Sequence, residues 1–268
     1  MTIRVCIAGV TGWTGIEVAR AILDSEPFEL AGAIARKSVG QDVGEILGLP
    51  RNGVTVVSTL DEALAQQTDV LVDFTSHDSV KQRAIAALER GVRVVIGTSG
   101  LTSSDYDEIE RVAETCKSGV VAAGNFSITA ALAKRFSLLA ARHLPSWEIV
   151  DYSSASNEVA PSGTVRELAE AMGGVAQNHL EVPLEDTHGE RAARGASIGG
   201  SQVHSIRLPG HVLGFDVNFG LPNERLNIRH EAGSGAEPYV QGTLVAVQKV
   251  MQIEGLVRGL DNLLFHAD

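Results

Sequence analysis

Glycines at a regular spacing follow the first apolar stretch of the chain and could hold a phosphate. Gly9, Gly12 and Gly15 come directly after the β-branched run Ile3–Ala8 and before an amphipathic stretch. Glycines allow a sharp turn and a close backbone approach to a diphosphate, and the following helix N-terminus offers unpaired N–H groups. The pattern predicts dinucleotide binding, although Ile7 stands where G-x-G-x-x-G has its first glycine. The alternative is a turn that only packs a helix on a sheet.

Two cations follow the second apolar run and bear on the choice of cofactor. In dinucleotide-binding domains an acidic residue at the end of this strand usually bonds the ribose 2′-hydroxyl of NAD. Here the run Phe28–Ile34 is followed by Arg36 and Lys37, with no acid. A 2′-phosphate would find a fork-shaped donor and a point charge. The sequence therefore favours NADPH, with NADH possible, and the alternative is that both cations are simply solvated.

A second candidate phosphate or carboxylate site lies in the second half of the chain. Ser162, Gly163 and Thr164 follow Pro161 at the expected start of a helix. Two hydroxyls, backbone N–H groups and the helix dipole together suit an anion. The same residue types also form ordinary helix caps, so both interpretations are open from the residues alone.

The glycine turn belongs to a stretch, residues 1–124, in which apolar strands alternate with helices. This alternation predicts a Rossmann-like α/β domain with a parallel sheet covered on both faces. Strands are expected at Ile3–Ala8, Phe28–Ile34, Val54–Val57, Asp69–Phe74, Val92–Ile96 and Val120–Ala123, and helices at Ile16–Leu23, Leu60–Gln66, Ser79–Arg90 and Ser103–Lys117.

Turns rich in Gly, Thr and Ser follow several of these strands. Because ligands bind at the carboxyl ends of parallel strands, these turns are expected to form the cofactor site together. The candidate cofactor-binding residues are Gly9, Thr11, Gly12, Trp13, Thr14, Arg36, Lys37, Phe74, Thr75, Gly97, Thr98, Ser99, Asn125 and Phe126. Trp13 either stacks on the adenine or packs within the protein.

The pattern changes in residues 125–234. A long helix at Ile128–His143 precedes a strand at Trp147–Ser154, and several stretches after residue 201 show β-like alternation. This predicts a second, α+β domain with an open mixed sheet for substrate binding and oligomerisation. The last stretch, residues 235–268, is expected to be helical at Glu237–Met251 and Gly255–Phe265 and to return to the first domain.

Composition excludes several classes of function. The 268 residues are 44% hydrophobic and 21% charged, which is ordinary for a globular protein. A net charge of -11 argues against a nucleic-acid partner, and no apolar run is long enough to span a membrane. Cys6 and Cys116 fit a reducing cytoplasm and form no metal-binding pattern. The chain begins with a strand, so no secretory signal is expected.

The turns and the second-domain motif together resemble 4-hydroxy-tetrahydrodipicolinate reductase (dihydrodipicolinate reductase), a family of lysine biosynthesis. The likeness covers nearly the whole chain, in order and spacing. It implies a dinucleotide domain, a smaller substrate domain, commonly a homotetramer, and NADH or NADPH as hydride donor. It also implies that Ser162, Gly163 and Thr164 hold a substrate carboxylate. The matching segments are Gly9–Gly15, Asp73–Thr75, Gly97–Gly100, Asn125–Ile128, Ala160–Thr164, Glu224–His230 and Gly242.

The chain departs from this family where the chemistry is done. The family carries a His-His pair where this chain has Ser153 and Ser154, and a lysine where it has Asn157. An imidazole can donate a proton near neutral pH and a serine hydroxyl hardly can, while asparagine lacks the charge that attracts a carboxylate. Tyr152 beside the lost pair carries a phenol that could donate a proton, or it packs in the sheet. The candidate catalytic residues are Tyr152, Ser153, Ser154 and Asn157.

The leading hypothesis is an NADPH-dependent reductase of a C=N bond in a small carboxylated imine other than the lysine-pathway substrate. An iminium carbon is already polarised, so its reduction needs less acid assistance than that of a ketone. Three alternatives stay open. They are the family reaction with a changed proton donor, a C=O reductase that uses Tyr152, and a dinucleotide-binding sensor without catalysis.

Overall fold

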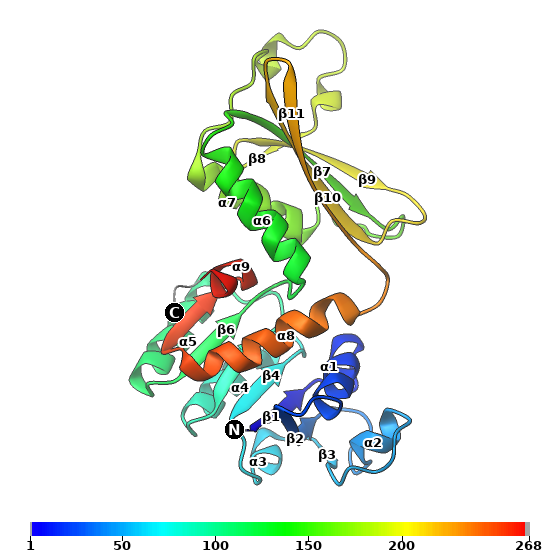
Figure 1. Cartoon of the computed structure of the whole chain (residues 1–268), viewed down its shortest axis with the longest axis vertical. Helices are drawn as coiled ribbons and strands as arrows, with labels where there is room; N and C mark the ends of the chain where they lie inside the picture. The colour runs from blue at the N-terminus through cyan, green and yellow to red at the C-terminus, as the bar shows by residue number, and fades with distance from the viewer. Residues whose placement is uncertain (1, 266–268) are drawn as a thin grey trace. The chain divides into compact units, whose positions relative to one another are not determined.

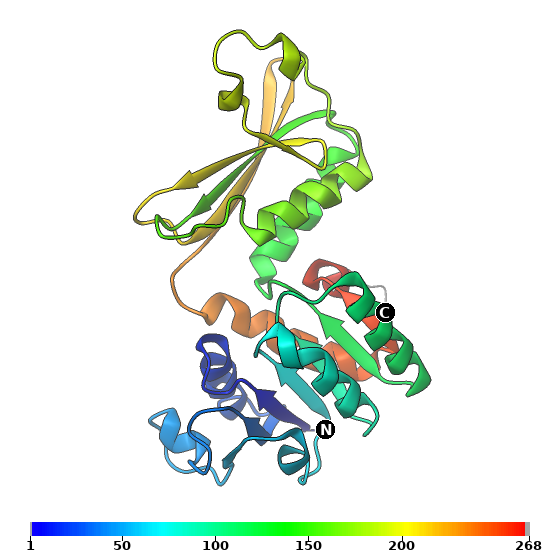
Figure 2. The same ribbon diagram turned by 180° about the vertical axis from the view of Figure 1, so that it is seen from behind.

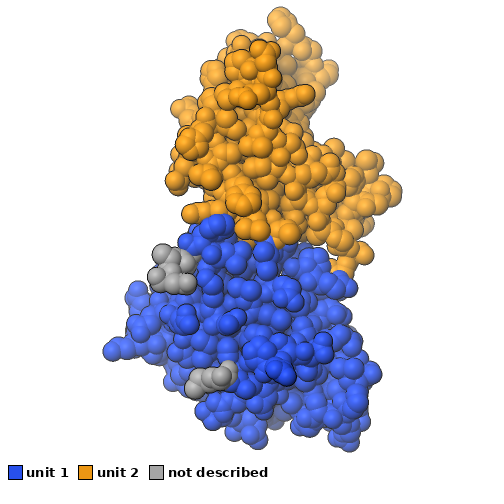
Figure 3. Space-filling model, viewed as in Figure 1, with its two compact units in different colours: residues 1–128, 236–268 blue, residues 129–235 orange. Residues whose placement is uncertain are grey.

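A computed structural model describes residues 2–265 of the chain. The chain divides into two compact units, which Figure 3 distinguishes by colour. Unit 1 comprises residues 1–128 and 236–268, and unit 2 comprises residues 129–235. Sequence analysis placed these boundaries at 124/125 and 234/235.

Unit 1 is built on a seven-stranded parallel sheet with the order β12-β6-β5-β4-β1-β2-β3 (Figure 1). Apolar, β-branched residues fill the central strands, which are buried on both faces. The fold class expected from the sequence is thereby confirmed. The strands are β1 (Ile3–Ala8), β2 (Phe28–Ile34), β3 (Val56–Val57), β4 (Val70–Asp73), β5 (Arg93–Ile96), β6 (Gly119–Ala122) and β12 (Gly255–Arg258).

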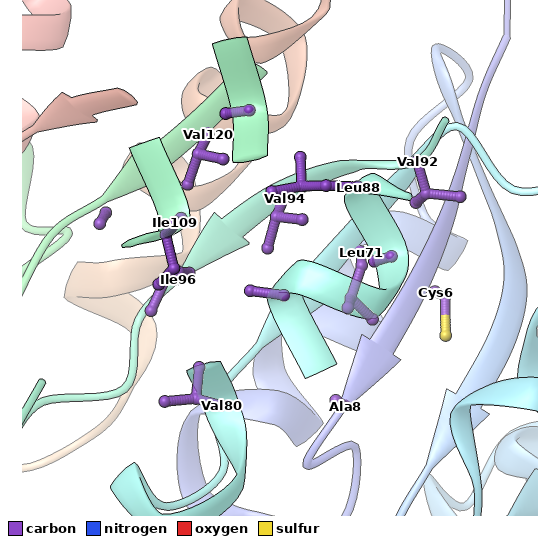
Figure 4. Close-up of a cluster of buried hydrophobic side chains, with 14 of the residues drawn as sticks. Cys6, Ala8, Leu71, Val80, Leu88, Val92, Val94, Ile96, Ile109 and Val120 are labelled. Atoms are coloured by element: carbon purple, nitrogen blue, oxygen red, sulfur yellow. The ribbon is translucent and has the colours of Figure 1, made fainter. Parts of the chain in front are cut away.

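Helices cover both faces of this sheet. On one face, α1 (Trp13–Leu23) packs against α8 (Glu237–Lys249), and on the other α4 (His77–Leu88) packs against α5 (Ser103–Thr115), as Figures 1 and 2 show from opposite sides. Figure 4 shows the apolar cluster beneath α4 and α5, to which Leu71, Leu88, Val94, Ile96 and Ile109 contribute. The shorter helices are α2 (Val43–Ile46), α3 (Leu60–Ala63) and α9 (Leu260–Leu264).

The expected helix over Gly255–Phe265 is wrong in its first part. Residues Gly255–Arg258 form strand β12, which pairs in parallel with β6, and only Leu260–Leu264 is helical. Gly255 and Gly259 bound the strand with φ angles of +85° and +89°, which break a continuous helix. The apolar residues between them have a partner strand at the sheet edge, and tertiary pairing overrides local periodicity.

Unit 2 contains a five-stranded mixed sheet with the order β11-β10-β7-β9-β8. Helices α6 (Ile128–Ala141) and α7 (Gly163–Val175) lie on one face of it (Figure 1). The buried side chains between the sheet and these helices include Trp147, Phe215 and Phe219. The strands are β7 (Ser146–Ser153), β8 (Ala196–Ile198), β9 (Ser201–Arg207), β10 (Leu213–Leu221) and β11 (Glu224–Ala232). Strand β8 lies within a polar stretch for which sequence analysis expected no element.

The other face of this sheet carries no α-helix among the described residues of unit 2, although the 3-10 helix Arg191–Arg194 meets it where Arg194 donates to Glu148 at 2.8 Å. Side chains alternate along β7, so Trp147, Ile149, Asp151 and Ser153 are buried toward α6 and α7. Glu148, Val150 and Tyr152 point to the opposite side, which we call the open face. No helix among residues 2–265 is long and apolar enough to cross a bilayer.

Candidate functional site

The strand order of unit 1 defines where a ligand would bind. From β1 the chain proceeds to β2 and β3 on one side, and then β4, β5 and β6 follow on the other. The topological switch point therefore lies between β1 and β4. In sheets of this type ligands bind in the crevice at the carboxyl ends of the two central strands. The turns that leave β1 and β4 are the glycine turn and the segment Phe74–Ser76.

The glycine turn is held by contacts that no larger residue would allow. Gly9 has a φ angle of +88°, and a Cβ atom added to it would lie 2.4 Å from the carbonyl oxygen of Phe74. A Cβ atom on Gly15 would lie 2.1 Å from the carbonyl oxygen of Gly9. Gly12 is the N-cap of α1 and provides no side-chain cap, so the first N–H groups of the helix remain available. This turn fits a diphosphate.

Trp13 lies at the first position of α1, and 58% of its surface is exposed. Its indole meets the ring of Tyr239 in α8 edge to face, with ring centroids 5.6 Å apart. Burial raises the pKa of the Tyr239 phenol. Trp13 therefore packs within the protein on one side and leaves the rest of its indole accessible to a ligand. This geometry is compatible with both packing and stacking on the adenine.

Arg36 and Lys37 follow β2 after one residue, Ala35, and are both exposed. Within residues 2–265 neither side chain forms an ion pair. Ser38, the next residue, has a φ angle of +64°, an uncommon conformation for a residue other than glycine. The two cations thus lie next to the glycine turn in the sheet, because Gly9 donates to the carbonyl oxygen of Ile34 at 2.8 Å.

The turns after β4 and β5 are organised around the buried carboxylate of Asp73. Thr75 donates to it through its backbone N–H at 3.0 Å and its hydroxyl at 2.6 Å. The Thr98 hydroxyl lies 3.2 Å from the same oxygen and accepts from the Thr75 N–H at 2.9 Å. The hydroxyls of Thr75 and Thr98 therefore point toward the protein interior. A Cβ atom on Gly97 would lie 2.0 Å from the Phe74 ring, so this glycine makes room for that ring.

The turn after β6 is closed by its own contacts. Asn125 accepts from the N–H of Ser127 at 2.8 Å, and Phe126 is buried, with its ring centroid 5.9 Å from that of Phe74. A Cβ atom on Gly242 would lie 1.9 Å from the carbonyl oxygen of Phe126. Ser99 is exposed in the turn after β5. The carboxyl edge of the sheet thus brings together turns from β1, β4, β5 and β6.

In unit 2, Ser153 and Asn157, at one histidine position and the lysine position of the family, bond to each other. The Ser153 hydroxyl donates to the carbonyl oxygen of Val212 at 3.2 Å and accepts from the amide of Asn157 at 2.8 Å. The Asn157 carbonyl oxygen accepts from the N–H of Val159 at 3.0 Å. Ser154 lies 3.3 Å from Ser156, oxygen to oxygen. Ser153 and Asn157 therefore hold the loop before Pro161 in place.

Ser162 is also engaged within the protein. Its N–H and hydroxyl donate to the carboxylate of Asp151 at 2.9 and 2.7 Å. Arg207 donates to that carboxylate at 2.7 Å and to the carbonyl oxygen of Val159. Thr164 has no side-chain hydrogen bond within residues 2–265, and the N–H groups of Gly163 and Thr164 begin helix α7. Two of the expected anion donors therefore already bind an internal carboxylate.

Tyr152 lies on the open face, opposite Ser153. Its hydroxyl donates to Asp216 at 2.9 Å, and the guanidinium of Arg229 lies 5.5 Å from the ring centroid. Burial raises the pKa of the Tyr152 phenol, and the hydrogen bond to Asp216 raises it further. The His211 ring packs 5.1 Å away, between ring centroids. The structure therefore does not bring Tyr152 together with the other candidate catalytic side chains.

Sequence reasoning missed two ion pairs that hold these turns. Arg83 pairs with Asp73 in unit 1, and Arg207 pairs with Asp151 in unit 2. Both aspartates are fully buried: Asp73 ends the apolar strand β4, and Asp151 follows the apolar pair Ile149 and Val150 within β7. A buried charge needs a partner, so an aspartate directly after apolar strand residues could have indicated an ion pair. Its partner was not evident, because Arg207 is far from Asp151 in the sequence.

A parallel sheet with a glycine turn at its switch point, joined to an open-sheet unit, defines a two-domain protein of the dinucleotide-binding class. Two family profiles match the chain: "Dihydrodipicolinate reductase, N-terminus" over residues 3–126 and "Dihydrodipicolinate reductase, C-terminus" over residues 125–264. The chain therefore belongs to the dihydrodipicolinate reductase family, which confirms the resemblance found in the sequence.

Individual relatives agree with this assignment over the full length. The chain is 39% identical to the 4-hydroxy-tetrahydrodipicolinate reductase of Moorella thermoacetica over 267 residues, or 98% of each chain. It is 37% identical to that of Desulfitobacterium hafniense, again with 98% of both chains covered. A dipicolinate-bound dihydrodipicolinate reductase from a Paenisporosarcina species is 31% identical, with a TM-score of 0.87 over 98% of this chain and 99% of that one.

More distant structures share the fold alone. An amine dehydrogenase from Mycobacterium smegmatis matches 97% of this chain and 96% of its own, with a TM-score of 0.68 and 16% identity. The two-unit architecture therefore occurs in proteins whose sequences have diverged far from this one, and the assignment of chemistry rests on particular residues.

Proposed function

We propose that the protein is an NADPH-dependent reductase of a C=N bond in a small carboxylated imine other than the standard lysine-pathway substrate. The observation that carries the proposal is the fate of Ser153 and Asn157. They stand where the family has a proton donor and a carboxylate-binding cation, and here they bond to each other and to the backbone. Neither supplies a proton or a positive charge.

Such a site suits a substrate that arrives as an iminium ion. When bound, the nicotinamide supplies a hydride, whose electron pair forms the new C–H bond. The π pair of the C=N bond moves to nitrogen and cancels its positive charge, so this step needs no proton from the protein. A ketone would instead leave an alkoxide that requires an acid within hydrogen-bond reach. The protein's part is then to bind and orient the substrate.

The chain's own residues supply binding in both units. We assign the diphosphate to the N–H groups at the start of α1, which Gly12 leaves uncapped, and the 2′-phosphate to Arg36 and Lys37. We assign the substrate carboxylate to the N–H groups of Gly163 and Thr164 and to the Thr164 hydroxyl. Asp151 holds Ser162 at the N-cap of the helix, next to the exposed Gly163 and the half-buried Thr164.

A screen of cyclic and acyclic imino acids for NADPH oxidation tests the proposal, with 4-hydroxy-tetrahydrodipicolinate included. We expect turnover of at least one imino acid. Turnover of the lysine-pathway substrate should be lower by on the order of 10²–10⁴, the usual contribution of a general acid. Ordinary turnover of that substrate would favour the family reaction with a changed proton donor. Binding of the dinucleotide without turnover of any imine or ketone would favour a sensor.

The second candidate, a C=O reductase that uses Tyr152, has weaker support. The Tyr152 phenol donates to Asp216 on the open face, whereas Ser153 and Ser162 are buried on the other side of the sheet. Tyr152→Phe separates the two proposals. Retained imine turnover supports the first, and loss of a measured ketone turnover supports the second.

A further inference from the structure

The carboxylate of Asp73 binds residues of two turns at the carboxyl edge of the unit 1 sheet. Asp73 ends β4, and its side chain is 1% exposed. It accepts from the backbone and hydroxyl of Thr75 and lies within hydrogen-bond distance of the Thr98 hydroxyl. Through these bonds the carboxylate fixes the turn after β4 to the turn after β5.

Arg83 supplies the cation that allows this carboxylate to be buried. It lies in the middle of α4 and reaches back toward the start of its own helix. Nη1 donates to Asp73 at 2.5 Å and to the Thr75 hydroxyl at 3.0 Å, and Nη2 donates to the Ser79 hydroxyl at 3.1 Å. The side chain is 17% exposed. One guanidinium therefore joins the end of β4, the turn after it and the first turn of α4.

The segment held in this way lies against the glycine turn at the switch point. Phe74 lies between Asp73 and Thr75. Its carbonyl oxygen is so close to the glycine turn that a Cβ atom on Gly9 would lie only 2.4 Å from it. The Phe74 ring fills the space that Gly97 leaves. A shift of Phe74 would therefore displace the glycine turn, whose N–H groups we assign to the diphosphate.

We propose that Arg83 is a positioning residue for the dinucleotide, acting through Asp73 and Thr75 rather than by touching the cofactor. This inference rests on the proposed dinucleotide dependence. It differs from the role of Arg36 and Lys37, which discriminate between the two cofactors through the 2′-phosphate. Because Arg83 sets the turn that both cofactors share, its loss weakens NADPH and NADH by the same factor.

The test measures the Kd of NADPH and NADH by calorimetry for the full chain. The variants are Arg83→Gln, Arg83→Lys, Asp73→Asn and the double variant. Arg90→Gln is the matched control, because Arg90 follows the same helix and pairs with Asp61, whose side chain is 78% exposed. We expect Arg83→Gln to raise both Kd values about tenfold, with Arg83→Lys between it and the wild type and Arg90→Gln unchanged. The Kd values of the double variant should equal those of the weaker-binding single variant, since both substitutions remove the same interaction.

Thermal unfolding without cofactor separates positioning from simple stability. A lower Tm for Arg83→Gln with unchanged Kd values would overturn the inference. If adding Arg83→Gln to Asp73→Asn raises the Kd values a further tenfold above those of Asp73→Asn alone, the inference is also overturned, because Arg83 would then contact the cofactor itself. If Arg83→Gln does not fold, Arg83→Lys and the double variant carry the same comparison. Failure of the wild type to bind either dinucleotide would overturn the proposed function, and this inference with it.

Discussion

Ser162 and Thr164 lie two positions apart, but their hydroxyls have different partners. The Ser162 hydroxyl donates to Asp151, and the Thr164 hydroxyl has no partner within the described residues. We expect Thr164→Val to raise KM for a carboxylated substrate by a factor that corresponds to about 0.5–1.5 kcal/mol. Ser162→Ala should instead lower the free energy of unfolding by about 1–3 kcal/mol, since it removes a donor from a buried carboxylate.

Steady-state kinetics and urea unfolding of the two variants check this division of roles. A neutral analogue that lacks the carboxylate serves as the control, because Thr164→Val should leave its KM unchanged. A larger effect on KM from Ser162→Ala than from Thr164→Val would show that Asp151 does not retain Ser162 when substrate binds.

Arg36 and Lys37 are the residues on which the cofactor preference depends. Replacing both with glutamine should weaken NADPH binding by about 1.5–3 kcal/mol and leave NADH nearly unchanged, because only the 2′-phosphate distinguishes the cofactors. Calorimetric Kd values for both dinucleotides measure this. Equal affinity of the wild-type protein for NADPH and NADH would contradict the preference.

At the scale of elements, Gly97 and Phe74 couple the turns after β5 and β4. A Cβ atom at Gly97 would lie 2.0 Å from the Phe74 ring, so Gly97→Ala should destabilise the fold by about 1–3 kcal/mol and weaken dinucleotide binding. Gly124→Ala is the matched control, because a Cβ atom there meets nothing within 4 Å. Adding Phe74→Leu should restore part of the loss in urea unfolding. No recovery would mean that the ring is not the obstacle.

The packing of β11 on α6 gives unit 2 a pH dependence. His230 is 4% exposed, and its Nδ1 atom lies 3.3 Å from the Thr129 hydroxyl. Burial lowers its pKa below the ordinary value of 6.5. The unfolded chain therefore takes up a proton first as the pH falls. The stability that His230 contributes is complete above about pH 6.5 and is lost as the pH falls toward the folded-state pKa.

His230→Gln removes this titration. The decrease in unfolding free energy between pH 7.5 and pH 5.5 should be smaller for the variant than for the wild type. Each tenfold difference in proton affinity corresponds to about 1.4 kcal/mol. Urea unfolding at the two pH values measures it, and identical pH dependence in both proteins would contradict the role of burial.

At the scale of the whole molecule, the open face of unit 2 is where we expect oligomerisation. Among the described residues, α-helices cover only the other face of this sheet, and Val150, Tyr152 and Ile206 remain partly exposed on the open side. A sheet with one uncovered face commonly buries it against another element, and a second copy of the chain is the partner we expect. The assembly that we predict is a homotetramer.

Light scattering after size-exclusion chromatography measures the assembly. Val150→Glu should shift the protein to a smaller species, because it places an unpaired charge in the expected interface. Leu139→Glu is the control, since Leu139 is 54% exposed on helix α6. A wild-type monomer, or a tetramer unaffected by Val150→Glu, would contradict this assignment of the interface.

Local features of the sequence determined the alternation of strands and helices, the glycine turn and the family. Each depends on residues close together in the chain, such as Gly9, Gly12 and Gly15, whose spacing alone dictates a turn before a helix. Strand periodicity also places Tyr152 and Ser153 on opposite faces. The side of the sheet that each faces depends on where the helices pack, which only the tertiary structure decided.

Partners far apart in sequence were likewise decided by the fold alone. Asp151 holds Ser162 and Arg207, and β12 pairs with β6 although its local pattern had suggested a helix. A hydrogen bond or strand pairing between distant segments forms only after the chain has brought them together, and it leaves no local periodicity to read. The resemblance therefore predicted Ser153, Ser154 and Asn157 as the positions where the family has its histidines and lysine, and the structure showed what these side chains bind.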